Sequence, residues 1–273
     1  WTMLLQASDI HVSFSREGTG FFRKERRAVL NGVGFSLEEH RCLGIVGESG
    51  CGKSTLGRVV TGLLAPDSGT VLVDGKDIHA CRGAEKRKIG RCGSIVFQDY
   101  SSSVNPRFRV EEIVAEPLLH EKLDPKERGE RVLPLLEKTG LGSEFFHRYP
   151  HQLSGGQLQR VCIARALAGS PRYILLDEAI SSLDVSVQVQ IMDLLIELKE
   201  KDGLPYIFIT HDLEAVTYIC DSVLFMHKRR SVERVTDLSP LADVVHPFSR
   251  NLLRSVSGLE TIFEGDGERF PTL

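Results

Sequence analysis

Short, continuously apolar runs alternate with helix-like patterns along most of this chain. Arg41–Val46, Tyr173–Leu176 and Tyr206–Thr210 are almost wholly apolar, and a segment with the 3.6-residue period of a helix follows each of them. Strands that are apolar on both faces and alternate with helices are typical of a parallel sheet covered on both sides. The pattern therefore predicts an α/β fold.

The same two periods predict the other elements. Further strands are expected at Leu4–Phe14, Val33–Leu37, Thr70–Val73 and Ser94–Phe97, with a last strand at Ser222–Met226. Helices are expected at Lys53–Leu64, Gln157–Ala168, Val185–Lys201 and Leu213–Cys220.

A change of pattern divides the chain. Between Asp99 and Leu153, Pro and Gly separate three segments with helical spacing, Val110–His120, Pro125–Thr139 and Ser143–His147. We interpret residues 99–157 as a helical subdomain inserted into a core formed by residues 1–98 and 158–236. Residues 237–273 have weaker periodicity and are expected to form a short tail.

The composition is that of an ordinary globular protein. The chain has 273 residues, a formal net charge of −3, 41% hydrophobic and 26% charged residues. A pI of about 6.3 argues against a nucleic-acid surface as the main feature. We interpret the basic runs Arg23–Arg27, Arg82–Arg91 and Lys228–Arg230 as solvated surface.

Neither a membrane span nor a disulfide framework is expected. No apolar run approaches the roughly 18 residues that cross a bilayer, and Trp1–Asp9 lacks the pattern of a signal peptide. The six cysteines form no Cys-x-x-Cys pair, so zinc ribbons and redox motifs are not expected. Free thiols in a reducing cytosol are the expectation.

A glycine-rich segment between an apolar strand and a helix has the spacing of a phosphate-binding loop, GxxxxGK[ST]. Its glycines let successive backbone N–H groups point at phosphate oxygens, and the helix that follows adds its positive end. Lys53 can reach the β- and γ-phosphates, and Ser54 can ligate Mg²⁺. The candidate ATP ligands are Gly47, Glu48, Ser49, Gly50, Cys51, Gly52, Lys53, Ser54 and Thr55. Because Cys51 lies inside the loop, a bulky thiol reagent is expected to block ATPase activity, and bound ATP is expected to protect against it.

Two carboxylates end the apolar strand Tyr173–Leu176. The carboxyl end of a parallel strand lies at the same sheet edge as the phosphate loop. Asp177 is therefore expected to hold Mg²⁺ and Glu178 to act as general base toward an attacking water.

Leu153–Gln157, with the sequence Leu-Ser-Gly-Gly-Gln, opens another helix whose free N–H groups and hydroxyl form a second anion site. The helical insert separates this site from the phosphate loop, so the two need not face each other within one chain. Two chains packed head to tail would sandwich ATP between the loop of one and the Ser-Gly-Gly of the other. ATP would then stabilise the dimer, and hydrolysis would release it.

With this signature placed between a phosphate loop and a strand ending in Asp-Glu, the chain resembles the ABC ATPases from about Leu4 to Arg254. The resemblance implies a RecA-like core with an antiparallel β subdomain and a helical insert. It implies Gln98 as the glutamine that senses Mg²⁺ and the membrane subunits, Asp184 as a signal across the dimer, and His211 as the switch histidine at the γ-phosphate. The residues serving the partner's ATP would be Ser154, Gly155, Gly156 and Gln157.

The aromatic residue that stacks on adenine is less sharply defined. Phe14 is the choice by position, because any π-face can stack on a base. Phe21 and Phe22 in the next loop are the alternatives, and Phe14 could instead be a core residue.

Three features resemble the importer branch for oligopeptides, dipeptides and nickel: the long loop after Phe14, the Ser103–Arg107 segment and the His246–Leu253 segment. Val104, Ala179 and the Leu158–Cys162 segment are most similar to nickel-importing members. The hairpin after the last strand departs from the pattern, because Lys228–Glu233 lacks the usual glycine.

The resemblance implies an ATP-binding and ATP-hydrolysing importer subunit with ATP and Mg²⁺ as cofactors. Nickel ions or a nickel chelate are the expected cargo, with oligopeptides or dipeptides as the alternative and a soluble, non-transport ABC ATPase as a remote one. Expected partners are a second, paralogous ATPase subunit, two transmembrane permease subunits and an extracytoplasmic binding protein, but no nucleic acid. The subunit would be peripheral, at the cytoplasmic face of the inner (plasma) membrane.

Overall fold

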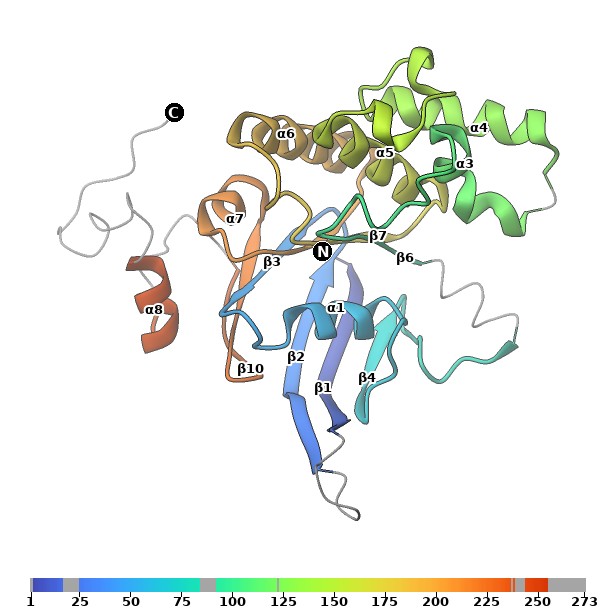
Figure 1. The fold of residues 1–273 in the computed structure, drawn as a ribbon. Helices are drawn as coiled ribbons and strands as arrows, with labels where there is room; N and C mark the ends of the chain where they lie inside the picture. The colour runs from blue at the N-terminus through green and yellow to red at the C-terminus, as the bar shows by residue number, and fades with distance from the viewer. Residues whose placement is uncertain are drawn as a thin grey trace.

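Two β-sheets lie below a group of helices in the computed structural model, which describes residues 2–16, 25–83, 92–121, 123–236, 238 and 244–254. Helices α3 to α6 gather at the top of the view and the strands β1, β2 and β4 at its base (Figure 1). The predicted architecture, with a largely parallel core sheet, an antiparallel β subdomain and a helical part, is confirmed.

The larger sheet has six strands in the order β10-β9-β3-β8-β7-β6. Their bounds are β3 (Cys42–Gly47), β6 (Gly93–Val96), β7 (Tyr173–Asp177), β8 (Tyr206–Ile209), β9 (Ser222–His227) and β10 (Arg230–Val235). All neighbours are parallel except β9 and β10. The prediction that Ser222–Met226 is the last strand is wrong. β10 was missed because its Arg, Ser and Glu residues give an edge strand no continuous apolar run.

The smaller sheet is antiparallel, in the order β2-β1-β4-β5. Its strands are β1 (Met3–Arg16), β2 (Glu25–Glu38), β4 (Ser68–Val73) and β5 (Lys76–Asp77). The strand expected at Val33–Leu37 is only the second half of β2, which pairs with β1 as far as Arg16 and Glu25.

The inner strands of the large sheet supply two cores at once. Along β7, Leu175 packs with α1 (Lys53–Val60) and the antiparallel sheet, whereas Leu176 packs with the helices on the other side. This explains why β3, β7 and β8 are buried at every position. Helix α1 ends four residues before the predicted Leu64, because Gly62 has a φ of 77°.

The helical part is packed on α5, with α3 and α4 against it (Figure 1). The helices are α3 (Val110–Ala115), η1 (Glu116–His120), α4 (Pro125–Lys138), η2 (Ser143–Phe145), η3 (Pro150–Gln152), α5 (Gly155–Ala168), α6 (Val185–Asp202) and α7 (Leu213–Ile219). The single helix expected over Val110–His120 is divided at Pro117, which has no N–H for a continuing helix. None of the helices in the described part of the chain is long and apolar enough to cross a bilayer.

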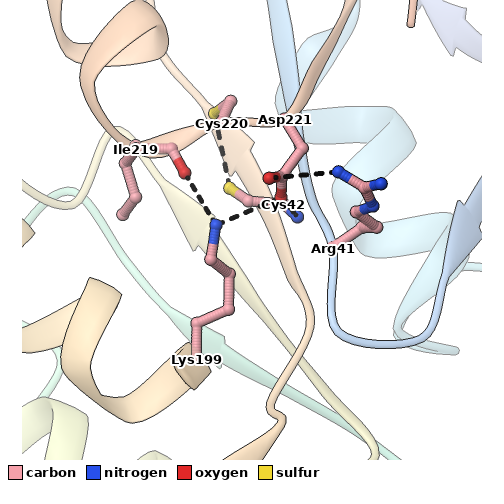
Figure 2. Close-up of polar contacts among 6 residues, drawn as sticks. All are labelled: Arg41, Cys42, Lys199, Ile219, Cys220 and Asp221. Atoms are coloured by element: carbon pink, nitrogen blue, oxygen red, sulfur yellow. Dashed lines mark hydrogen bonds and ion pairs between the residues drawn. The ribbon is translucent and has the colours of Figure 1, made fainter. Parts of the chain in front are cut away.

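A polar cluster joins the start of β3 to α6 and to the end of α7 (Figure 2). The Asp221 carboxylate accepts a hydrogen bond of 2.7 Å from the Cys42 N–H and lies 3.1 Å from Lys199 Nζ. The thiols of Cys42 and Cys220 are 3.3 Å apart in the core. These contacts fix α7, and with it the segment that begins at His211, against the strand that carries the phosphate loop.

Part of the expected C-terminal tail belongs to the core. Helix α8 (Pro247–Arg254) is preceded by residues whose N–H groups donate to the Glu233 carboxylate, at 2.7 Å from Val245. Val244 and Leu253 are fully buried. The expectation of a simple tail is therefore wrong for residues 244–254, and residues 255–273 lie outside the described part.

We expect Tyr173→Phe to lower the free energy of unfolding by about 1–2 kcal/mol, because the buried Tyr173 hydroxyl donates to the Val60 carbonyl at 2.6 Å. The matched control is Tyr218→Phe, which removes a hydrogen bond to Asp193 at a half-exposed site. Denaturant titration should show a change below about 0.5 kcal/mol for the control. Equal changes in the two variants would contradict the role given to Tyr173.

Candidate functional site

The phosphate loop lies between β3 and α1 with no room for side chains at two of its glycines. A Cβ at Gly47 would lie 2.2 Å from the Met226 carbonyl oxygen, and one at Gly52 would lie 2.7 Å from the Val29 carbonyl oxygen. Gly50 and Gly52 also have φ values of 76° and 108°. The loop can therefore take its curled path only with glycine at these positions.

Lys53 and Ser54 lie at the base of this loop, as the motif predicts. Lys53 is buried, and its Nζ donates to the carbonyl oxygens of Gly47 at 2.6 Å and Glu48 at 3.1 Å. A buried ammonium held only by carbonyls can exchange them for phosphate oxygens, which carry a full charge. Thr55 follows within the first turn of α1.

The phosphate loop and the end of β7 meet at the Ser54 hydroxyl, which donates to Asp177 Oδ1 at 3.0 Å. Burial raises the pKa of the Asp177 carboxyl, and the Ser54 hydrogen bond opposes the shift. A hydroxyl beside a carboxylate in a partly buried position is an oxygen donor set that suits Mg²⁺, and a divalent cation would favour the ionised form.

Glu178 directly follows β7, and His211 lies two residues after the end of the neighbouring strand β8. Glu178 has a φ of 49°, and its N–H donates to the Ile209 carbonyl at 2.8 Å. Its Oε2 lies 3.7 Å from Nδ1 of His211. Positive φ at a long side chain is strained, and such strain is common where a side chain must be held in one direction. The structure thus brings the two predicted catalytic groups together.

Gln98 is exposed after β6, at the start of the segment that leads into the helical part. The next residue, Asp99, orders this turn because its carboxylate accepts from the N–H groups of Ser102 and Ser101 and from the Ser101 hydroxyl. These bonds, that from Ser102 first, lower the pKa of Asp99 to about 2. No described hydrogen bond joins Gln98 to Asp177, so its place beside the metal stays a prediction.

The signature segment forms the N-terminus of α5. The Ser154 hydroxyl accepts from the Gln157 N–H at 3.3 Å, and the Gln157 side chain accepts from the Ser154 N–H at 2.9 Å. This capping box explains why α5 begins at Gly155, two residues before the predicted start. A Cβ at Gly155 would lie 2.6 Å from the Tyr100 hydroxyl, and one at Gly156 would lie 2.5 Å from Val187.

The signature segment and the phosphate loop are separate within this chain. No hydrogen bond or ion pair in the described parts joins Ser154–Gln157 to Gly47–Ser54. Asp184 is exposed and caps α6, whose Val187 contacts the signature glycine.

Of the aromatic candidates for adenine, Phe14 lies on β1 with 45% of its surface exposed. It pairs with Arg27 of β2 and is not a core residue. An exposed ring at this place is free to stack on a base, and its role stays a prediction. Phe21 and Phe22 lie outside the described residues.

Two basic residues complete the surroundings of the loop, and the sequence analysis missed them. A cavity of about 380 Å³ is lined by Lys228 and Arg229 of the β9–β10 turn and by Glu48, Ser49, Gly50 and Cys51. The interpretation of Lys228–Arg230 as surface agrees with the exposure of Lys228 and Arg230, but the sequence does not show that this turn lies beside the phosphate loop. The missing glycine was the only signal in the sequence that set this turn apart.

These observations define the class of protein, because a phosphate loop, an Asp-Glu strand end and a signature helix on this fold occur together in ABC ATPases. Residues 30–181 match the family described as ABC transporter, and the chain belongs to that family.

The chain is similar to transporter subunits of known name. It is 42% identical over 246 residues to the dipeptide transport ATP-binding protein DppF of Haemophilus influenzae, covering 88% of this chain and 74% of that protein. It is 41% identical over 251 residues to the metal-staphylopine import system ATP-binding protein CntF of Staphylococcus aureus, covering 92% of this chain and 98% of that protein. The solved ATP-binding cassette MJ0796, a post-hydrolysis dimer bound to ADP and Pi, has a TM-score of 0.74 and 30% identity, covering 85% of this chain and 98% of that one.

The expected reactivity of Cys51 is wrong. The side chain is 5% exposed and packs beneath the loop with Leu30 and Leu56, and burial raises the pKa of its thiol. We expect Ellman's reagent to modify equal numbers of thiols in the native parent and in Cys51→Ser, because Cys51 is shielded. In denaturant the parent should show one thiol more. A native difference of one thiol would contradict the burial of Cys51.

Proposed function

We propose that this chain hydrolyses ATP between two cassettes and thereby powers uptake of oligopeptides or dipeptides through a membrane permease. The observation that carries the ATPase part is the meeting of five groups at the carboxyl edge of one sheet. Lys53 and Ser54 lie at the end of β3, Asp177 and Glu178 at the end of β7, and His211 at the end of β8.

In this proposal each group has one task. Lys53 and the loop N–H groups hold the β- and γ-phosphates. Ser54 and Asp177, with Gln98, hold Mg²⁺, which supplies charge neutralisation at the phosphates. Glu178 accepts the proton of the attacking water, and His211 contacts the γ-phosphate and keeps Glu178 in place.

The second cassette follows from the separation of the two anion-facing surfaces. Ser154–Gln157 forms a helix N-terminus that can bind an anion. It makes no described hydrogen bond or ion pair with the phosphate loop of the same chain. A paralogous ATPase of the same fold would supply the missing half. The permease subunits and an extracytoplasmic binding protein complete the importer, and the chain would lie at the cytoplasmic face of the plasma membrane.

The cargo is the finer part of the proposal. The similarity to a dipeptide transporter favours peptides over the nickel ion that the sequence suggested. A second candidate is a metal chelate, since the metal-staphylopine relative is aligned over 98% of its length. The two cargo classes differ in the permease and the binding protein, so the test must be made on transport.

We expect Glu178→Gln to lower kcat for ATP about 10²- to 10⁴-fold, because a neutral amide cannot accept the proton of the attacking water. ATP binding should be retained, since the phosphate loop is unchanged. The control is Glu214→Gln, an exposed carboxylate in the first turn of α7, which should keep the parent rate. A Glu178→Gln rate equal to that of the parent would remove Glu178 from the role of base.

We expect cells whose only copy of this gene carries Lys53→Ala to lose uptake of radiolabelled dipeptides and to keep uptake of nickel, because Lys53 holds the nucleotide that drives transport. The control is Lys126→Ala, a side chain that is 86% exposed on α4. Loss of nickel uptake with peptide uptake intact would overturn the peptide assignment and leave the ATPase assignment standing.

A further inference from the structure

We infer that Lys228 and Arg229 form a second, basic wall of the nucleotide site, which binds the terminal phosphate of ATP. This inference deepens the proposed ATPase function and rests on it. It adds two residues on the β9–β10 turn to the ligands that the phosphate-loop motif supplies.

The position of the turn is the first argument. β9 is the direct neighbour of β3, with Met226 opposite Gly47, so the residues after Met226 emerge beside the residues after Gly47. The cavity of about 380 Å³ is lined by both segments. Any phosphate that approaches the N–H groups of Ser49 and Gly50 therefore enters the same space as the two basic residues.

The second argument is that the side chains of Lys228 and Arg229 have no hydrogen-bond or ion-pair partner among the described residues. Arg230 lies against β2, because its guanidinium donates at 2.8 and 3.1 Å to the side-chain oxygen of Asn31 once the Asn31 amide is turned so that its oxygen faces the donors. Lys228 and Arg229 make no side-chain hydrogen bond or ion pair within the parts of the chain that the structure describes. Two cations beside a phosphate-binding loop are attracted to phosphate at short range.

The third argument is the backbone of the turn. Lys228 and Arg229 have φ values of 45° and 72°. Asn and Gly are the residues that such a two-residue hairpin turn favours, and Lys and Arg are strained there. Such strain is common at functional sites, and here both strained residues line the cavity beside the phosphate loop.

The turn is also anchored on both sides. The Arg229 carbonyl accepts from the Asn31 N–H at 2.9 Å. The His227 ring stacks on Phe248 of α8 at 4.2 Å between centroids, and its Nδ1 lies 3.5 Å from the Glu48 carboxylate. His227 thus lies between α8 and the Glu48 carboxylate, at the base of the turn.

The decisive variant is Lys228→Asn combined with Arg229→Gly, which removes both charges and gives the turn the residues that its φ values favour. Binding of ATP, ADP and inorganic phosphate to the full chain is measured calorimetrically without divalent cations, so that no hydrolysis occurs. The dissociation constant for ATP should rise about 5- to 10-fold at low salt and less at high salt. That for ADP should rise less than about 2-fold, because ADP lacks the phosphate in question. The thermal midpoint should stay unchanged or rise.

The charge control is Lys126→Gln combined with Lys201→Gln, since these side chains are 86% and 72% exposed on α4 and α6. It changes the net charge equally and should leave ATP binding unchanged. Exchanging the two cations, with Lys228→Arg and Arg229→Lys, should preserve affinity.

Three results would overturn the inference: unchanged ATP binding in the Asn-Gly variant, an equal loss for ADP and ATP, or the same loss in the charge control. Loss of inorganic phosphate binding without loss of ATP binding would also overturn it, because the site would then serve free phosphate. A parent chain that binds no ATP would instead contradict the proposed function itself.

Discussion

The close approach of two strands to the phosphate loop is the constraint on which the rest of this structure depends. The carbonyl of Met226 at the end of β9 and that of Val29 on β2 touch the loop where Gly47 and Gly52 stand. The loop therefore lies between the parallel sheet and the antiparallel sheet, with strand backbone in close contact on both sides. This arrangement explains why α1 is buried between the sheets although it is only eight residues long. It also places the β9–β10 turn beside the loop.

A parallel sheet brings catalytic groups together because each strand ends at the same edge. Ser54, Asp177 and His211 are far apart in the sequence, yet each follows the end of one of three adjacent strands. The signature segment opens α5, the helix on which α3 and α4 of the helical part pack. The capping box gives hydrogen-bond partners to two backbone N–H groups at the N-terminus of α5, but Ser154 remains exposed. In the described parts of the chain the signature helix and the phosphate loop share no hydrogen bond or ion pair, which is the reason for proposing that a second cassette brings the two together.

The sequence was most informative where local pattern and long-range structure agree. The strands β3, β7 and β8 are buried at every position because they serve two cores, and the meeting of Ser54 with Asp177 follows from strand order. β10 was missed because an edge strand with Arg and Glu has neither an apolar run nor a strict alternation. The burial of Cys51 could not be predicted, since it depends on β2 covering the underside of the loop. The proximity of Lys228 to Glu48 depends on the register of β9 against β3, which no local pattern encodes. The cargo could not be predicted from these residues, because in the proposed importer the permease and the binding protein select it.

Backbone strain gives a last indication of where function lies. Seven described residues other than glycine have positive φ: Asp9, His40, Asp74, Ser170, Glu178, Lys228 and Arg229. Four of these are Asp, His or Ser, most of which tolerate the left-handed region comparatively well at turns. The other three are long, charged side chains, each held at a cost of about 1–3 kcal/mol, and all three border the phosphate site. Strain of this kind persists only where the surrounding structure holds it, and here the holders are identifiable. Ile209 binds the Glu178 N–H, Asn31 binds the Arg229 carbonyl, and α8 packs on the residue before Lys228. Helix α8 thereby supports, through His227, the turn that lies beside the phosphate loop.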